Sequence, residues 1–325
     1  MMKRTSLFLA AACMTLAAAA EVTYQTVPLP QQIAIDPSGK QALLIKGQAV
    51  TYPAGNDKMK STAELAGKYL SLTPQEADKK AVPGVQLSLG LKSENPEAYL
   101  ITVDKKGIRI QGASESGVFY GVQTLRKSVM EEKGDTIRLP YATVSDEPRF
   151  GYRGTMLDCA RHFFPVSFVK EFIDILALHG VNRFHWHLTD DQGWRFEVKS
   201  LPELAVKGSV RPYTVVGKNI GVDNAAGAIY DDTPETGYYT QEEMKEIVRY
   251  AEERFITIVP EIDLPGHMIA ALSVYPELGC TGGPYNVWCR WGIAQDVLCA
   301  GNPKTLDFLH KVMDVGQRLH LEAPA

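Results

Sequence analysis

Apolar residues in the first part of the chain occur in short runs that glycine and proline interrupt. Residues 85–89, 99–103 and 108–110 form runs with the length and composition of β-strands. In residues 114–129, by contrast, the apolar positions recur with helical spacing. Short strands combined with an amphipathic helix predict a small α+β domain over residues 21–147.

A polar segment with prolines, residues 139–148, is typical of a domain junction, and a different pattern follows it over residues 148–325. Residues 152–158 predict a buried strand, and residues 183–188 predict the next one. Between them lies a predicted helix that Gly180 ends. The apolar face of this helix consists of Phe168, Phe172, Ile175, Leu176 and His179.

The alternation of strand and helix continues after a long segment that is rich in glycine and aspartate. Thr240 and Glu243 have the spacing of a capping box, which predicts the start of a helix that runs to Arg254. Residues 256–262 predict a third strand. Strands that alternate with helices are typical of a parallel α/β fold, in which catalytic groups gather at the carboxyl ends of the strands.

Polar and ionisable residues lie at the carboxyl end of each of these strands. One such residue by itself is often a helix cap or a hydrogen-bonded core side chain. Their recurrence at three successive strand ends instead predicts one functional site. The candidates are Asp158, Arg161, His185, His187, Asp190, Asp191, Glu261, Asp263 and His267.

Composition narrows the kind of partner. The 325 residues are 45% hydrophobic and 22% charged, which is enough apolar material for two packed cores. The formal net charge is −4, and Lys and Arg form no run. Such a charge pattern is not typical of proteins that bind nucleic acid or an anionic membrane surface. We therefore expect a small or neutral ligand.

The N-terminus has the pattern of a signal peptide over residues 1–20. Lys3 and Arg4 precede an apolar stretch, residues 7–16, and alanines lead up to a cleavage position after Ala20. The stretch is shorter than the ~20 residues that a membrane-spanning helix needs. We expect a periplasmic or extracellular protein without a membrane span. A lipoprotein anchored through Cys13 is a weaker alternative, because this cysteine lies inside the apolar stretch.

An exported protein can oxidise its cysteines, and four follow the predicted cleavage position: Cys159, Cys280, Cys289 and Cys299. Zinc binding is the alternative, but their spacing matches no common zinc-finger or ribbon pattern. We expect one disulfide, between Cys280 and Cys299.

Three segments of the second half resemble one family closely. They are GYRGTMLDCARHFF at residues 151–164, HWHLTDDQGW at 185–194 and PEIDLPGH at 260–267. Together they resemble the β-N-acetylhexosaminidases of glycoside hydrolase family 20. The segment GVFYGVQTL, residues 117–125, resembles the end of the accessory N-terminal domain of that family. The resemblance extends to about Asp314.

The resemblance implies a small α+β accessory domain followed by the first part of a TIM (β/α)8 barrel. It also implies an enzyme that removes terminal β-linked N-acetylglucosamine or N-acetylgalactosamine from glycans with retention of configuration. In this family the acetamido oxygen of the substrate is the nucleophile, one Asp orients it, and the adjacent Glu is the general acid. The scheme implies no cofactor and no metal.

Specific roles follow from the same resemblance. Arg161 matches the arginine that binds sugar hydroxyls, for which a planar fork of donors is suited. Asp190 and His267 match an Asp–His pair that adjusts the general acid. We expect Asp191 and Trp194 to be structural partners of the same turn.

The strand that carries HWH also allows an alternative. We expect alternation along this strand to turn only one of His185 and His187 toward the barrel interior. The pair also resembles the His-x-His of metal-dependent barrel hydrolases, with His267 as a third ligand. In those enzymes the pair ends the first barrel strand, whereas here a strand with Arg161 precedes it, so this alternative is disfavoured.

The C-terminus departs from the family pattern. The paired acids of the family lie in a His-x-Gly-Gly-Asp-Glu run, and no Gly-Gly-Asp-Glu occurs in the sequence. Residues 305–314 resemble the helix that precedes that run, but residues 315–325 do not continue the resemblance, and Glu322 is the last carboxylate. We therefore expect a C-terminally truncated family member without the catalytic pair and without turnover. The corresponding non-enzyme alternative is an inert or carbohydrate-binding fragment.

Overall fold

The N-terminal part of the chain is built on a seven-stranded mixed sheet. The computed structural model describes residues 22–77, 84–130, 132, 134–217 and 228–321. In spatial order the strands are β1 (Gln32–Ile35), β9 (Ala142–Asp146), β6 (Tyr99–Asp104), β7 (Gly107–Gly112), β5 (Val85–Leu89), β3 (Ala49–Tyr52) and β4 (Thr73–Glu76). Strands β2 (Gln41–Ile45) and β8 (Thr136–Pro140) form a separate antiparallel ribbon.

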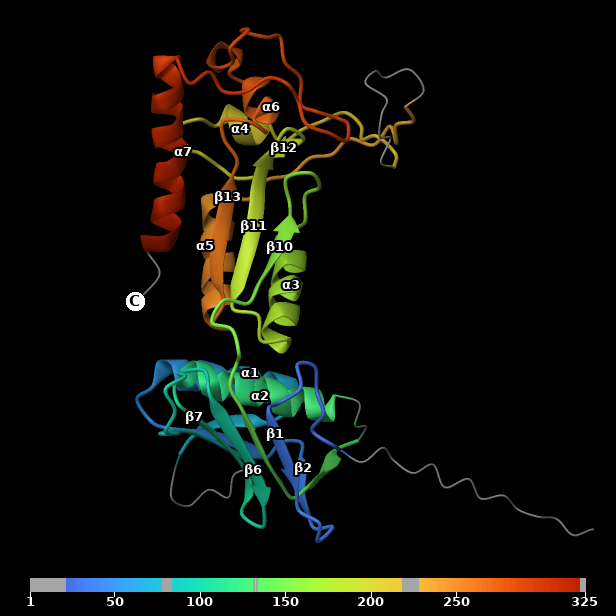
Figure 1. Ribbon diagram of the computed structural model, residues 1–325, viewed down its shortest axis with the longest axis vertical. Helices are drawn as coiled ribbons and strands as arrows, with labels where there is room; N and C mark the ends of the chain where they lie inside the picture. The colour runs from blue at the N-terminus through green and yellow to red at the C-terminus, as the bar shows by residue number, and fades with distance from the viewer. Residues whose placement is uncertain (1–21, 78–83, 131, 133, 218–227, 322–325) are drawn as a thin grey trace, which may run out of the picture.

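Two helices, α1 (Asp57–Leu70) and α2 (Glu115–Val129), pack on the sheet and lie between it and the rest of the molecule (Figure 1). At Gly117, helix α2 lies close to the backbone just before β6: an added Cβ would lie 2.3 Å from the carbonyl oxygen of Ala98. A side chain at this position would force the helix away from the sheet. Sheet and helices together form the predicted α+β domain.

The second part contains three parallel strands, β10 (Gly154–Asp158), β11 (Arg183–Asp190) and β13 (Thr257–Ile262). Helices α3 (Val166–Leu178) and α5 (Gln241–Glu252) connect them and pack against each other on one face of these strands. The apolar side chains on that face, such as Phe184, Trp186 and Ile258, are buried. The remaining elements are β12 (Gly193–Trp194), α4 (Glu203–Val206), α6 (Ile269–Leu272), a 3-10 turn (Pro276–Leu278) and α7 (Pro303–Leu321).

Local sequence signals place most of these elements correctly. The capping box of α5 has both of its hydrogen bonds, since Thr240 Oγ1 accepts from the Glu243 backbone N–H at 3.1 Å and the Thr240 N–H donates to the Glu243 carboxylate at 2.8 Å. Gly180, with a φ of +71°, follows the end of α3 in the left-handed conformation that glycine adopts readily. Side-chain capping and glycine conformation are local effects, so the sequence is sufficient to predict them.

Two expectations about burial were wrong. The predicted buried strand 152–158 begins only at Gly154, and Met156 is 48% exposed because helices cover a single face of the sheet. The buried face of α3 is also displaced by about one residue from the predicted face: Phe168 and Ile175 are exposed. The buried residues of α3 are Val169, Ile173, Leu176 and Ala177.

Some predictions concern residues outside those described. The signal peptide, residues 1–20, and Glu322 belong to this group. Among the described residues, no helix combines the length and the apolar character that crossing a membrane requires.

A partly buried ion pair joins the two parts of the chain. Both guanidinium Nη atoms of Arg153 donate to the carboxylate of Glu97, at 2.8 and 2.9 Å. The Nε atom donates to the Gly180 carbonyl at 2.6 Å, and Nη2 also contacts the Tyr120 hydroxyl at 3.1 Å. A bidentate pair of this kind fixes direction as well as distance. The N-terminal domain therefore has a defined attachment to the strands that carry the polar candidates.

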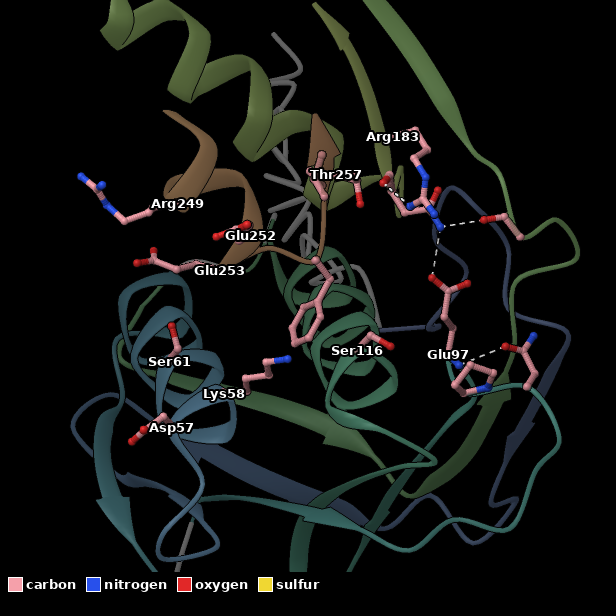
Figure 2. A pocket seen from close by; sticks show the side chains of 16 residues that line it. Asp57, Lys58, Ser61, Glu97, Ser116, Arg183, Arg249, Glu252, Glu253 and Thr257 are labelled. Carbon is pink, nitrogen blue, oxygen red and sulfur yellow. Dashed lines mark hydrogen bonds between the residues drawn. The ribbon is translucent and has the colours of Figure 1, made fainter. Parts of the chain in front are cut away.

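Beside this joint lies a cavity of about 810 Å³ between the two parts (Figure 2). Lys58 and Ser116 line it from α1 and α2, while Arg183 and Thr257 line it from the first residues of β11 and β13. It therefore lies at the amino ends of these strands, opposite to the predicted site. This cavity and the candidate chemistry are therefore at different ends of one sheet.

Candidate functional site

Strand register brings three ionisable residues into one row at the carboxyl end of the sheet. Asp158 of β10 is paired with His187 of β11, which is paired with Glu261 of β13. Parallel strands in register align the same face of each strand, so the three side chains project together. They lie on the face that no described helix covers. The convergence predicted from the three strand ends is therefore observed.

The expectation that only one of His185 and His187 would face the interior was wrong. Both histidines contact the same carboxylate oxygen, Glu261 Oε2: His187 through Nδ1 at 2.8 Å, and His185 through Nε2. The reason lies in strand geometry, because side chains two residues apart point to the same face. The alternation argument holds for neighbours and excludes Trp186, which is buried on the helix side.

Arg161 is held in the loop after β10 by three polar neighbours. Its Nη1 atom donates to Asp158 at 2.8 Å, its Nη2 atom lies 2.6 Å from Oδ2 of Asp190, and its Nε atom donates to Gln192 at 3.3 Å. The other oxygen of Asp158 accepts the Arg161 backbone N–H at 3.0 Å. The side chain nevertheless remains 37% exposed. The guanidinium is thus fixed in direction while part of its donor fork still faces the open side.

Asp190, the last residue of β11, connects this arginine to His267. Its Oδ1 atom lies 3.1 Å from Nδ1 of His267, so the predicted Asp190–His267 contact is present. His267 has a φ of +55°, a left-handed conformation that costs a non-glycine residue of order 1 kcal/mol. Packing must offset that cost in order to hold the imidazole against Asp190. The catalytic role of this pair stays a prediction.

Asp191 and Trp194 occupy the structural positions expected of them. The buried carboxylate of Asp191 accepts backbone N–H groups from Ile269 at 3.2 Å and Ala294 at 3.1 Å, which ties the start of α6 and the loop at Ala294 to the end of β11. The indole N–H of Trp194 donates to the Phe196 carbonyl at 2.7 Å within the core.

The carboxyl groups of the site differ in their electrostatics. Burial disfavours the charge of Asp190, but the hydrogen bond with His187 and the charge of Arg161 outweigh burial and lower its pKa. The pKa of Glu261 is lowered in the same way, since hydrogen bonds from His187 outweigh burial. Burial raises the pKa of Asp191. Burial and a hydrogen bond with Glu261 raise the pKa of Asp263. Asp190 and Glu261 therefore retain negative charge most strongly.

The donor groups do not suit a metal ion well. Among the described residues, two sets bring three donor atoms within 4.8 Å of one another: His187, Asp190 and Asp263, and Asp190, Asp191 and His267. Asp190 belongs to both sets, and the guanidinium of Arg161 already lies 2.6 Å from it. A second cation there would be repelled by the first. The three histidines of the alternative metal site are also occupied by carboxylates: His185 contacts Glu261, His267 contacts Asp190, and His187 contacts both.

The predicted disulfide partners, Cys280 and Cys299, lie side by side as thiols. All four cysteines in the described part of the chain are free thiols, so the Cys280–Cys299 disulfide is not formed in the structure. The two side chains do adjoin, because Gly279 and Leu298 form an antiparallel bridge next to them. A hydrogen bond between the two thiols raises the pKa of Cys280. A covalent bond between them stays a prediction.

Two contributions to the site could not be assigned from the sequence. Glu261 was a candidate without a role, and it proves to be the shared partner of two histidines. Gln192 was not a candidate, yet it contacts Arg161 and donates to the Arg290 carbonyl at 3.1 Å. The His-x-His pattern, which places two histidines on one face of the strand, was the available signal for the role of Glu261. No local pattern indicates the contact of Gln192 with Arg161.

Family comparison covers both parts of the chain. The profile of the glycosyl hydrolase family 20 catalytic domain matches residues 150–321, and the profile of domain 2 of the same family matches residues 23–147. The beta-hexosaminidase of Porphyromonas gingivalis is 39% identical over 264 residues, which are 79% of this chain and 31% of that protein. The beta-hexosaminidase of Vibrio furnissii is 47% identical over 182 residues, 55% of this chain and 28% of that protein.

Solved structures agree with the profiles. The N-acetyl-beta-hexosaminidase of Streptomyces plicatus superposes with a TM-score of 0.78 at 30% identity, over 92% of this chain and 57% of that one. The chain thus spans about a third of these curated relatives and somewhat more than half of this solved one. The expected fold, a small α+β domain followed by the first part of a TIM (β/α)8 barrel, is confirmed. From its two profile matches and from its fold, the chain belongs to glycosyl hydrolase family 20.

Proposed function

We propose that the protein carrying these residues is a β-N-acetylhexosaminidase that removes terminal N-acetylglucosamine or N-acetylgalactosamine from glycans. The observation that carries the proposal is Arg161, which three neighbours hold in place while its side chain remains 37% exposed beside Asp190 and His267. An oriented, partly unsaturated guanidinium is suited to vicinal sugar hydroxyls. The names of the relatives and a Streptomyces plicatus enzyme solved with its product N-acetylglucosamine support this substrate class.

In this proposal the described residues supply binding and tuning rather than the reacting acids. Arg161 binds sugar oxygens through its free donors. Asp190 and His267 act as a relay that adjusts the field on a neighbouring general acid. The nucleophile is the acetamido oxygen of the substrate, and an Asp–Glu pair orients it and protonates the leaving group. No Gly-Gly-Asp-Glu run, which carries that pair in the family, occurs in residues 1–325.

The substrate class is tested with a full-length family 20 protein that carries these residues. We expect it to release nitrophenol from the β-N-acetylglucosaminide or the β-N-acetylgalactosaminide and to leave the plain β-glucoside intact. Hydrolysis of the glucoside without hydrolysis of either acetamido sugar would show that the assignment is wrong. Metal analysis of the active protein separates the metal-dependent hydrolase alternative, which requires stoichiometric metal.

A polypeptide of residues 21–325 alone is expected to have no hexosaminidase turnover. General acid catalysis contributes about 10² to 10⁴ in rate, and none of its residues matches the family's acid pair. The assay uses a fluorogenic N-acetylglucosaminide, with circular dichroism to establish that the polypeptide is folded. Activity that co-purifies with the chain and disappears in Glu322→Gln would contradict this expectation. Binding of N-acetylglucosamine without turnover would identify the carbohydrate-binding alternative.

We also propose export to the periplasm or the cell exterior. The support is the charged start, the short apolar stretch and the alanines of residues 1–20. N-terminal sequencing of the mature protein tests it: a first residue Glu21 is expected, whereas an intact Met1 on cytoplasmic protein would contradict it.

A further inference from the structure

His187 occupies an unusual position among the ionisable residues of the site. Its side chain, in the middle of the Asp158–His187–Glu261 row, is only 3% exposed. Its Nδ1 atom lies 2.8 Å from Oε2 of Glu261, and its Nε2 atom lies 3.0 Å from Oδ2 of Asp190. Each ring nitrogen of this histidine thus faces a carboxylate oxygen.

This geometry restricts the proton count of the ring. A neutral imidazole has one donor and one acceptor nitrogen, whereas an imidazolium has two donors. An ionised carboxylate only accepts, so a neutral ring would set one nitrogen lone pair against a carboxylate oxygen. Two protons on the ring remove that repulsion and add a charge-assisted hydrogen bond on each side.

The alternative to an imidazolium is a neutral His187 ring whose Nε2 atom accepts a hydrogen bond from Arg161. Its Nη1 atom lies 3.3 Å from Nε2 of His187 and could donate to an unprotonated nitrogen. However, Nη1 already donates to Asp158 at 2.8 Å, and Nε2 lies nearer to Asp190 than to the guanidinium. The charged and titratable groups around the ring are Asp158, Arg161, His185, Asp190, Glu261 and Asp263. Carboxylates predominate among them, which favours a cationic ring.

We propose that His187 is a positioning residue, held as an imidazolium between Glu261 and Asp190, that fixes Asp190 so that its Oδ1 atom faces His267. Oδ2 of Asp190 is engaged by both His187 and Arg161, at 3.0 and 2.6 Å. Oδ1 is then left for His267 and for the Asp191 backbone N–H, which donates at 2.7 Å. The catalytic consequence rests on the proposed function, whereas the protonation state does not.

The electrostatic balance of the ring supports the same conclusion. Burial by itself disfavours a charged imidazole, but the hydrogen bonds with Asp190 and Glu261 outweigh burial and raise the pKa of His187. His185 contacts the same oxygen of Glu261 but is 39% exposed, and it has no carboxylate on its second nitrogen in the described part of the chain. The two histidines of the strand therefore provide an internal comparison.

The test is nitrogen NMR of ¹⁵N-histidine-labelled residues 21–325, titrated from pH 6 to pH 9. We expect both ring nitrogens of His187 to carry protons at pH 8. Glu261→Gln replaces an ionised acceptor by a neutral one of the same shape, so His187 should lose its second proton at lower pH. Asp190→Asn removes the other carboxylate and should have the same effect. Glu246→Gln, which removes an exposed ion pair with Lys170, is the matched control and should change nothing.

A single protonated nitrogen on His187 at pH 8 in the unaltered chain would overturn the proposal in favour of the Arg161-donated arrangement. Titration that is unchanged in both Glu261→Gln and Asp190→Asn would also overturn it. In a full-length active protein, Glu261→Gln should shift the pH dependence of kcat, whereas Glu246→Gln should not. If the NMR result holds but no hexosaminide is hydrolysed, the proposed function fails and the assignment of His187 stands.

Discussion

Arg153 and Arg161 lie eight residues apart, at opposite ends of strand β10, and each is paired with carboxylates. Arg153 is 17% exposed and uses its Nε and both Nη atoms on protein acceptors, namely Glu97, Gly180, Phe150 and Tyr120. Arg161 is 37% exposed; its Nε and both Nη atoms also have partners, but these are three contacts, with Gln192, Asp158 and Asp190, against five hydrogen bonds for Arg153. Both are ion pairs by distance, but only Arg161 has donors left for a ligand.

The comparison shows how the two arginines can be distinguished without reference to conservation. A saturated guanidinium joins parts of the protein and contributes to stability. A guanidinium that neighbours orient but do not saturate is prepared to bind, since its side-chain entropy is already reduced before the ligand arrives. The same chemistry at the two ends of one strand therefore has different expected consequences on mutation.

The largest effect is expected for Arg153→Ala. Removal of the guanidinium leaves the carboxylate of Glu97, which is 18% exposed, without its bidentate partner. Breaking a largely buried ion pair in this way should lower the free energy of unfolding by about 3 kcal/mol. Urea denaturation of residues 21–325 measures the loss, with the exposed neighbour Arg149→Ala as control. A loss as small as that of the control would contradict the structural role.

Arg161→Ala should separate binding from stability. Charge-assisted hydrogen bonds to a ligand are worth roughly 1.5 to 3 kcal/mol, so kcat/KM of a full-length protein should fall about 10- to 100-fold. The free energy of unfolding should change by only about 1 kcal/mol, because Asp190 keeps its contacts with His187 and His267. A loss of stability equal to that of Arg153→Ala would remove the distinction between the two arginines.

The stabilising contributions of Glu97, at one end of the strands, and of His187, at the other, should respond to pH in opposite directions. Hydrogen bonds from Arg153, acting against burial, lower the pKa of Glu97 below its ordinary 4.5, so its contribution is present above that pH and is lost on acidification. The pKa of His187 is raised above 6.5, so its contribution is present below that pH and is lost as pH rises through the higher folded value.

Melting temperature as a function of pH measures both contributions. Glu97→Gln should weaken the dependence on the acid side, and His187→Gln should weaken it on the alkaline side. The ordinary values of 4.5 and 6.5 bound the intervening range in which both contributions are present. If each substitution changed the melting temperature equally on the acid and the alkaline side, the contributions of Glu97 and His187 would not be independent.

The smallest effect is expected for Asp190→Asn, which keeps the shape of the carboxylate but removes its charge. The substitution should shift the pH–rate profile of a full-length protein, because the charge next to His267 is lost. Folding should be nearly unchanged in circular dichroism. An unchanged pH–rate curve on folded protein would exclude the relay role of Asp190.

Local patterns predicted much of this arrangement but did not predict its contacts. The capping box at Thr240 and the helix stop at Gly180 depend on residues three or fewer positions apart, and both are confirmed. The predicted buried face of α3 was displaced by about one residue. Apolar residues on a helix allow several neighbouring faces to be buried, and only the element that packs against the helix decides which one is. Met156 is exposed because helices cover only one face of the strands, and the sequence of β10 does not record which face that is.

By itself, the sequence determined the order of strands and helices, the placement of polar residues at strand ends and the family, because all three depend on spacing along the chain. Only the tertiary structure decided which atoms meet. His185 and Glu261 are separated by 76 residues, and their contact depends on the parallel register of β11 and β13. Whether an arginine is saturated depends likewise on every acceptor that surrounds it in space, and no local pattern records that number.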